Sequence, residues 1–211
     1  AEGEPIEAGM VTKSVERAQK KVEENNFGIR KRLLDYDDVM NKQREVVYDR
    51  RRHALGGERM KSEIFAYVED LAGGWYDEYQ PEGELEAFKN NVRTYMLCEV
   101  NISENEFRGM KREECIQRVL DAAEEFYARK EESLGSDFML RLEQYAIIQS
   151  IDDKWREHLR IMDEVKEGVH LRAYGQKDPL LEYKGEAFRM FEELIFEISK
   201  AAVDTAFKYF P

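Results

Sequence analysis

The chain has 211 residues, of which 42% are apolar and 37% are charged, a composition typical of a globular protein rich in helices. Its net charge of −12 argues against binding nucleic acid or an anionic membrane surface through overall charge. The sequence contains no apolar run of about 18 residues that would span a membrane, and its start lacks a signal peptide's basic and apolar regions. The first nine residues resemble a connector, so we expect the chain to be a piece of a longer protein. Cys98 and Cys115 have no CxxC partner and no histidine at ligand spacing, which predicts ordinary reduced thiols.

The first long element is a helix predicted over residues 12–52. The stretch contains no proline, and apolar residues recur along it mostly in steps of three and four. At 1.5 Å per residue the helix would be about 60 Å long, so we expect it to bridge several bodies. Gly28 could mark close packing of a partner, and the Gly56-Gly57 pair ends the helix. The apolar series consists of Val11, Val15, Ala18, Val22, Ile29, Leu33, Tyr36, Met40 and Val47, with Asn25 and Gln43 at its two vacant places.

Residues 57–135 differ in character, because glycine and proline divide them into shorter helical pieces. We predict helices over 61–71, 84–100 and 111–133, with Gly73 and Gly74 among the breakers. Ser103 and Glu106 have the spacing of a capping box. The aromatic residues of this segment form either a compact core or a binding surface, and helical spacing favours the core. They are Phe65, Tyr67, Trp75, Tyr79, Phe88, Tyr95 and Phe107.

Residues 136–211 return to long helices. Ser136 is a candidate N-cap for the first, whose apolar face runs from Phe138 to Val169. Asp178 followed by Pro179 is typical of a helix start and predicts a last helix over 179–209. Two long helices joined by a short loop must pack antiparallel as a hairpin.

The free tip of this hairpin would carry Leu171, Arg172, Tyr174 and Gln176. Tyr174 could grip a partner through its ring and hydroxyl together, or it could simply cap the hairpin against a neighbour. The pattern alone favours neither role.

Motifs for catalysis are missing from the sequence. It contains no GxxxxGK[ST] loop, no GxGxxG fingerprint and no HExxH, so we expect no catalytic residue and no metal site. Glu167 and His170 form one Glu-x-x-His pair, whereas a di-iron bundle needs two, which makes a helical metalloenzyme a weak rival. Carboxylates cluster at 35–38 and 152–153, where a solvated face or ion pairs explain them.

Several motifs resemble the SecA family of bacterial preprotein translocase motors. LLDYDDV at 33–39 resembles the family's long scaffold helix, and DKWREHL at 153–159 and GVHLRAYGQKDP at 168–179 resemble its two-helix finger. Residues 57–128 match only by position, as the family's helical wing. One departure is Ala173-Tyr174-Gly175, where the family has glycine before the tyrosine and alanine after it.

The resemblance implies an all-α fold in three parts. These are a connector and long scaffold helix over 1–56, a small helical wing domain over 57–135, and over 136–211 an antiparallel two-helix finger packed on the scaffold. It also implies that Tyr174 contacts substrate, with Leu171, Arg172 and Gln176 as its neighbours. Packing of the finger on the scaffold, and regulation of the motor, are implied for Trp155, Leu159, Met162 and Tyr36.

Function is likewise implied by the resemblance. SecA proteins use ATP to drive unfolded secretory preproteins through the SecYEG channel, working in the bacterial cytoplasm and peripherally at the inner face of the cytoplasmic membrane. This piece would contact the motor domains in cis, the channel and the preprotein. It would hold no cofactor, because ATP and Mg belong to motor domains, and Zn to a C-terminal tail, that are absent here. The alternative is an acidic helical scaffold or adaptor module of an unrelated assembly, without enzymatic activity.

The lack of any phosphate-binding motif generates a first prediction. We expect the purified chain to be predominantly helical by circular dichroism and to hydrolyse no ATP. Hydrolysis by a preparation free of contaminating ATPases would contradict this expectation.

Overall fold

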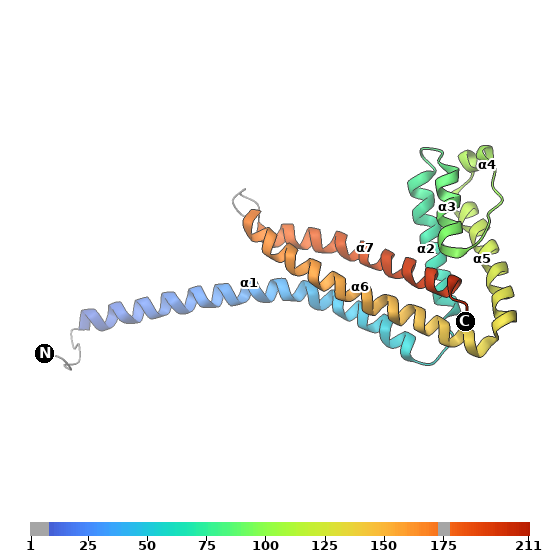
Figure 1. The fold of residues 1–211 in the computed structure, drawn as a ribbon. Helices are drawn as coiled ribbons and strands as arrows, with labels where there is room; N and C mark the ends of the chain where they lie inside the picture. Colours follow the sequence, from blue (N-terminus) through green and yellow to red (C-terminus); the bar gives the residue numbers. More distant parts are fainter. Residues whose placement is uncertain (1–8, 173–177) are drawn as a thin grey trace.

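The computed structural model describes residues 9–172 and 178–211, and in these ranges all regular structure is helical, which confirms the all-α prediction. Two long helices pack as a hairpin, which we call the finger, beside a third long helix, which we call the rod (Figure 1). The rod is α1 (Gly9–Leu55), and the finger is α6 (Ser136–Arg172) with α7 (Pro179–Lys208). The wing lobe consists of α2 (Lys61–Tyr79), α3 (Leu85–Met96), α4 (Glu104–Gly109) and α5 (Arg112–Leu134).

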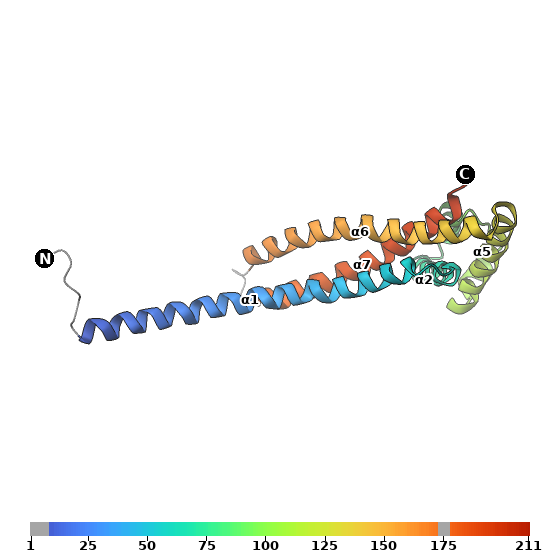
Figure 2. The ribbon, with the colours of Figure 1, turned by 90° about the horizontal axis from the view of Figure 1, so that it is seen from below.

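The rod contacts the finger over only part of its length. Figures 1 and 2 show α1 alongside α6 and α7 over its C-terminal half and extending beyond them at its N-terminal end. The wing lobe stands at the other end of the finger, where α2 and α3 pack on α7 and α5 leads directly into α6. The finger therefore lies between the rod and the wing lobe.

Two predicted helix boundaries were wrong. The helix predicted over 61–71 continues as α2 through Gly73 and Gly74 to Tyr79. A Cβ at Gly74 would lie 3.0 Å from the ring of Phe196 on α7, and one at Gly73 would meet the guanidinium of Arg112. These glycines therefore allow close packing and do not break the helix. The helix predicted over 84–100 ends at Met96, because Leu97 adopts a left-handed conformation with φ of 55°.

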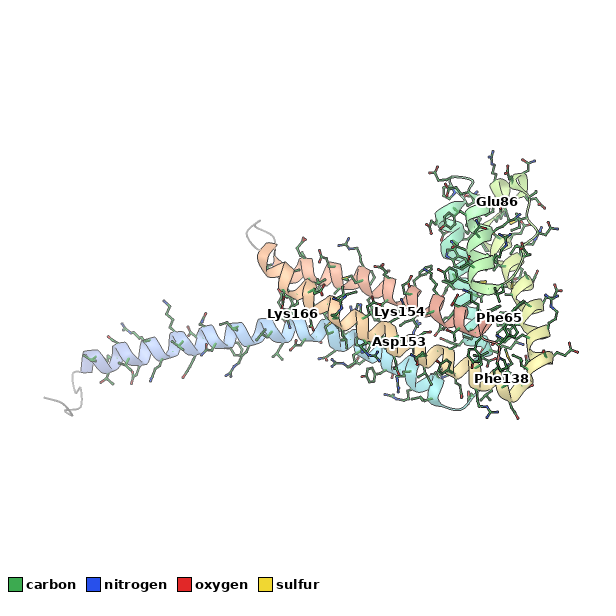
Figure 3. The ribbon with its side chains drawn as sticks, in the orientation of Figure 1. Phe65, Glu86, Phe138, Asp153, Lys154 and Lys166 are labelled. Atoms are coloured by element: carbon green, nitrogen blue, oxygen red, sulfur yellow. The ribbon has the colours of Figure 1, made fainter. Side chains whose placement is uncertain are left out.

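The aromatic residues of the wing lobe form a core, as predicted. Tyr67, Trp75, Phe88 and Phe107 are buried, while Phe65, Tyr79 and Tyr95 are partly buried and pack against them. Figure 3 labels Phe65 inside the lobe and Glu86 near its far end. The predicted capping box is confirmed, since the side chains and backbone amides of Ser103 and Glu106 bond reciprocally.

A polar junction fixes the base of the finger to the turn after the rod. Glu143 of α6 is fully buried and accepts hydrogen bonds from Arg59 (2.8 and 3.0 Å), the Met60 amide (3.0 Å) and the Tyr127 hydroxyl (3.1 Å). Four donors compensate the cost of burying this carboxylate. On α5, buried Lys130 donates to the Ala206 and Phe207 carbonyls at the end of α7 (2.7 and 3.0 Å).

One apolar core passes through this junction, from Val47 of the rod through the wing lobe to Phe207 of α7. The boundaries predicted at residues 56 and 135 fall at turns between helices. Whether they separate independent domains stays a prediction.

Candidate functional site

The apolar series of the rod forms one stripe along the helix, and the finger covers its C-terminal half. Tyr36, Gln43 and Val47 are buried there, and Met40 is partly buried. Because these residues recur in steps of three and four, they share one side of the helix, and α6 and α7 both pack against that side. The contact zone between the covered half of the rod and the finger is the candidate site.

Aromatic packing closes the part of this zone that lies farther from the wing lobe. The ring of Tyr36 meets the ring of Tyr183 on α7 edge-on, with centroids 4.8 Å apart. Met162 and Val169 of α6, together with Ala187 of α7, complete this cluster, and all are buried. Burial raises the pKa of Tyr183 to about 12.

A polar contact joins all three helices in the middle of the zone. Gln43 of the rod donates from Nε2 to the Ala187 carbonyl of α7 (2.9 Å), and its Oε1 lies 2.8 Å from Nε2 of His158 on α6. The His158 ring stacks on Trp155, with centroids 5.5 Å apart, and burial lowers the pKa of the imidazole. We call Gln43, His158 and the Ala187 carbonyl the polar node.

Ion pairs flank the polar node on both sides. Arg51 donates two hydrogen bonds to Asp152 (2.7 and 3.0 Å), and the bond from Arg51 lowers the pKa of that carboxyl. Lys166 donates to Asp37 (3.3 Å) and lies over the ring of Tyr36. Lys166 is labelled in Figure 3 near the rod, with Lys154 farther along α6. These contacts run in antiparallel order along α1 and α6.

The N-terminal half of the same stripe is exposed. Val22 and Ile29 keep 58% and 48% of their surface accessible, and Val15 and Leu33 are similar. A Cβ at Gly28 would meet nothing within 4 Å, so the close packing considered for this glycine has no counterpart within the described residues. The stripe therefore continues beyond the body that covers it.

Known proteins match the whole of this chain. Residues 5–209 match the family described as the SecA wing and scaffold domain. The chain belongs to the SecA wing and scaffold domain family. It is 52% identical to the protein translocase subunit SecA of Prosthecochloris aestuarii and 48% identical to that of Chloroherpeton thalassium, in each case over 210 residues. These alignments cover all of this chain but 20% of each relative, so the chain spans about a fifth of their length. Membership of this family argues against an adaptor module of an unrelated assembly.

Four residues predicted to pack the SecA finger on its scaffold come together in the contact zone. Tyr36 and Met162 are buried within it, Leu159 is partly buried, and Trp155 is 7% exposed. Trp155 lies on α6 between Asp152 and His158, both of which bond to side chains of the rod. All four side chains are buried or partly buried, whereas their role in packing the finger and in regulating the motor stays a prediction.

The predicted tip residues fall at the edge of the described SecA segment or outside it. Tyr174 and Gln176 lie outside the described residues. Leu171 and Arg172 are the last residues of α6, which passes through Gly168 without a break, so they do not belong to a loop as predicted. The helix continues past Gly168 although a glycine inside a helix is less favourable than an alanine by about 1 kcal/mol.

Sequence reasoning missed the polar node. The sequence contains one indication of it, because Gln43 is a polar residue at a position where the stripe would otherwise have an apolar one. Its partners could not be predicted, because they lie 115 and 144 residues away on two other helices. Over 9–172 and 178–211, no group of three His, Cys, Asp or Glu residues is placed to hold a metal ion. Within those ranges, none of the helices is both long and apolar enough to cross a membrane.

The burial of Trp155 generates the prediction for this site. Trp155→Ala should lower the free energy of unfolding by about 3 to 5 kcal/mol, because a large buried side chain leaves a cavity. Urea denaturation of the chain measures the change. Tyr145→Ala is the control, since Tyr145 is an aromatic on the same helix with 53% of its surface exposed and should cost less than about 0.5 kcal/mol. Equal midpoints for Trp155→Ala and the wild type would contradict the assigned packing.

Proposed function

We propose that this SecA segment is the mechanical arm of a protein translocase, joining an ATP-driven motor body to the finger that contacts the moving polypeptide. The relatives are called protein translocase subunits, and the chain corresponds to about a fifth of the length of each. The observation that carries the proposal is the rod's single apolar stripe, covered by the finger on one half and exposed on the other. Such a stripe is suited to hold two bodies on one rigid element.

Energetics support a partner for the exposed half. Burial of a Val, Leu or Ile side chain contributes about 1.5 to 3 kcal/mol, so covering four such residues would amount to several kcal/mol. Isolated apolar residues on a surface need no explanation, whereas a contiguous set marks a site of protein contact. The motor domains of the same polypeptide are the proposed occupant, because they would be linked to the rod covalently and meet it at high effective concentration.

A continuous helix would pass displacement from the motor to the finger. Backbone hydrogen bonds run along the rod without interruption from Gly9 to Leu55. The finger contacts it through buried rings, the polar node and two ion pairs. Because packed interfaces of this kind do not deform continuously, movement of the rod would carry the finger with it.

The tip of the finger is the proposed contact with unfolded preprotein at the SecYEG channel. A tyrosine suits a grip that must accept any sequence, since its ring packs on apolar side chains and its hydroxyl bonds to backbone amides. In this proposal Tyr174 makes the contact, and Leu171, Arg172 and Gln176 lie around it. ATP and Mg would bind the motor domains and Zn a C-terminal tail, and the assembly would work at the inner face of the cytoplasmic membrane.

Docking of the rod on the motor can be tested by binding. Ile29→Gln with Leu33→Gln removes two apolar residues from the exposed stripe, where the wild-type fold makes no buried contact. We expect this variant to keep its melting temperature and to bind the separately expressed motor domains at least about tenfold more weakly in calorimetry. It should also lose any effect of the chain on their ATP hydrolysis.

Lys20→Gln with Lys31→Gln is the matched control. These two exposed residues lie on the opposite side of the rod, and the variant carries the same number of glutamines. Binding as tight as that of the wild type is expected for the control. Wild-type affinity in the stripe variant would show that the motor does not cover the stripe.

The role of the finger tip can be tested in the full-length parent. Tyr174→Ala should slow preprotein transport. It should leave thermal unfolding nearly unchanged if the side chain contacts substrate as proposed, because changes outside the core usually alter stability by less than about 0.5 kcal/mol. Tyr174→Phe removes the hydroxyl alone, and Tyr174→Met removes the hydroxyl and the ring. If the alanine variant transports preprotein as fast as the wild type, Tyr174 has no gripping role.

A further inference from the structure

The polar node places hydrogen-bonding groups inside a contact zone that is otherwise mainly apolar. Gln43 and His158 are 6% and 4% exposed, so neither can exchange its partner for bulk water without separation of the helices. The side chains near them are mainly hydrophobic: the His158 ring contacts the rings of Trp155 and Phe191, and Val47 is buried one turn along the rod. The interaction energy of the node therefore depends more strongly than that of the surrounding contacts on the axial position of the finger helices relative to the rod.

The contacts allow one arrangement of donors and acceptors at the node. The Ala187 carbonyl can only accept a hydrogen bond, so the group of Gln43 facing it is the amide NH₂. The other end of the amide, Oε1, then faces His158 and can only accept. His158 must donate from Nε2, and the stacked ring of Trp155 holds the imidazole plane in place. One side chain of the rod thus hydrogen-bonds to both helices of the finger, and each of the two bonds requires a particular group opposite it.

The junction at Glu143 anchors the base of the finger, but along the shaft beyond it apolar packing alone would permit α6 and α7 to shift along the rod. The stripe repeats in steps of three and four, so displacement by one helical turn, about 5.4 Å, again places apolar residues opposite apolar residues. The same displacement would leave the amide of Gln43 and the imidazole of His158 buried without partners, which is unfavourable. In coiled coils a single buried polar residue selects one register through this difference.

The flanking ion pairs are less able to select a register. The side chains of Arg51 and Asp152 are 35% and 37% exposed, and those of Lys166 and Asp37 are 31% and 59% exposed. Long, partly solvated side chains can follow a small displacement or bond to water in its place.

We propose that Gln43 and His158 are positioning residues that fix the axial register of the finger on the rod, and thereby how far the finger tip extends from the motor body. The register is a property of this chain alone. Its consequence for transport rests on the function proposed above.

A double variant can test whether the node fixes the axial register without lowering the stability of the fold. Gln43→Met with His158→Phe replaces the node by apolar groups of similar size, and replacing buried polar pairs in this way often leaves a protein as stable as before. Spin labels attached at Glu24→Cys on the rod and Glu167→Cys on α6, both exposed, report the axial position of the finger by pulsed electron resonance. We expect the native thiols to react slowly with the label, because Cys98 and Cys115 are both buried and burial raises the pKa of each thiol.

We expect one narrow distance distribution for the labelled wild type. The double variant should keep its helical content and give a broader distribution, or a second distance displaced along the rod by about one helical turn. Gln43→Met alone leaves His158 unpaired and should also broaden the distribution. This single variant replaces the double variant in the test if the double variant does not fold.

Val47→Ala is the control for general loosening, since it truncates a buried apolar residue of the same stripe and leaves the node intact. It should lower the melting temperature and keep the narrow distribution. A narrow wild-type distribution in the node variants, or equal broadening by Val47→Ala, would overturn the proposal. Neither the motor nor a substrate is present in this measurement, so its outcome is independent of the tests of transport.

Discussion

Packing of the rod's C-terminal half against both finger helices is the interaction on which the rest of the structure depends. Neither finger helix buries its apolar face completely in the hairpin, and Tyr36, Gln43 and Val47 of the rod complete the core between them. The same contacts hold the rod at a fixed angle to the wing lobe, because α7 packs on α2 and α3 at the other end of the finger. The buried face of the rod thus sets the position of the finger on the rod, while α2 and α3 set the position of the finger on the wing lobe.

The finger is held at two levels that differ in chemistry. At its base, Glu143 and Lys130 bond to groups of other helices and are buried with their charges compensated by several partners. Burial lowers the pKa of Lys130 to about 8, while the carbonyl ends of α7 and the ring of Phe210, 4.3 Å away, favour the ammonium form. In the middle, neutral groups of the polar node make the contact. Beyond the node, the outer part of the finger is held by the apolar cluster around Tyr36 and by the partly exposed ion pair of Lys166 with Asp37.

Much of the fold could be predicted from the sequence because it is determined by local pattern. Repetition in steps of three and four identified the long helices, and Asp178 caps α7 as predicted, accepting a hydrogen bond from the Leu180 amide (2.9 Å). Gly73 and Gly74 were misread, because the effect of a glycine within a helix depends on which distant residue approaches it, here Arg112 and Phe196. The packing residues Trp155 and Tyr36 could be predicted from motifs, whereas the pairing of Gln43 with His158 depends on tertiary alignment. Periodicity likewise marked the rod's stripe from Val11 to Val47 without showing that the finger covers half of it.

Amide hydrogen exchange along the rod, in the chain alone and in the full-length parent, tests most directly whether the stripe is shared between two bodies. In the chain alone, amides of residues 36–54 should exchange slowly and those of residues 11–34 should exchange much faster, because tertiary packing stabilises only the first set. In the parent, residues 11–34 should become as protected as the rest. Equal exchange of residues 11–34 in the two proteins would contradict the proposal that a motor body covers the exposed half of the rod.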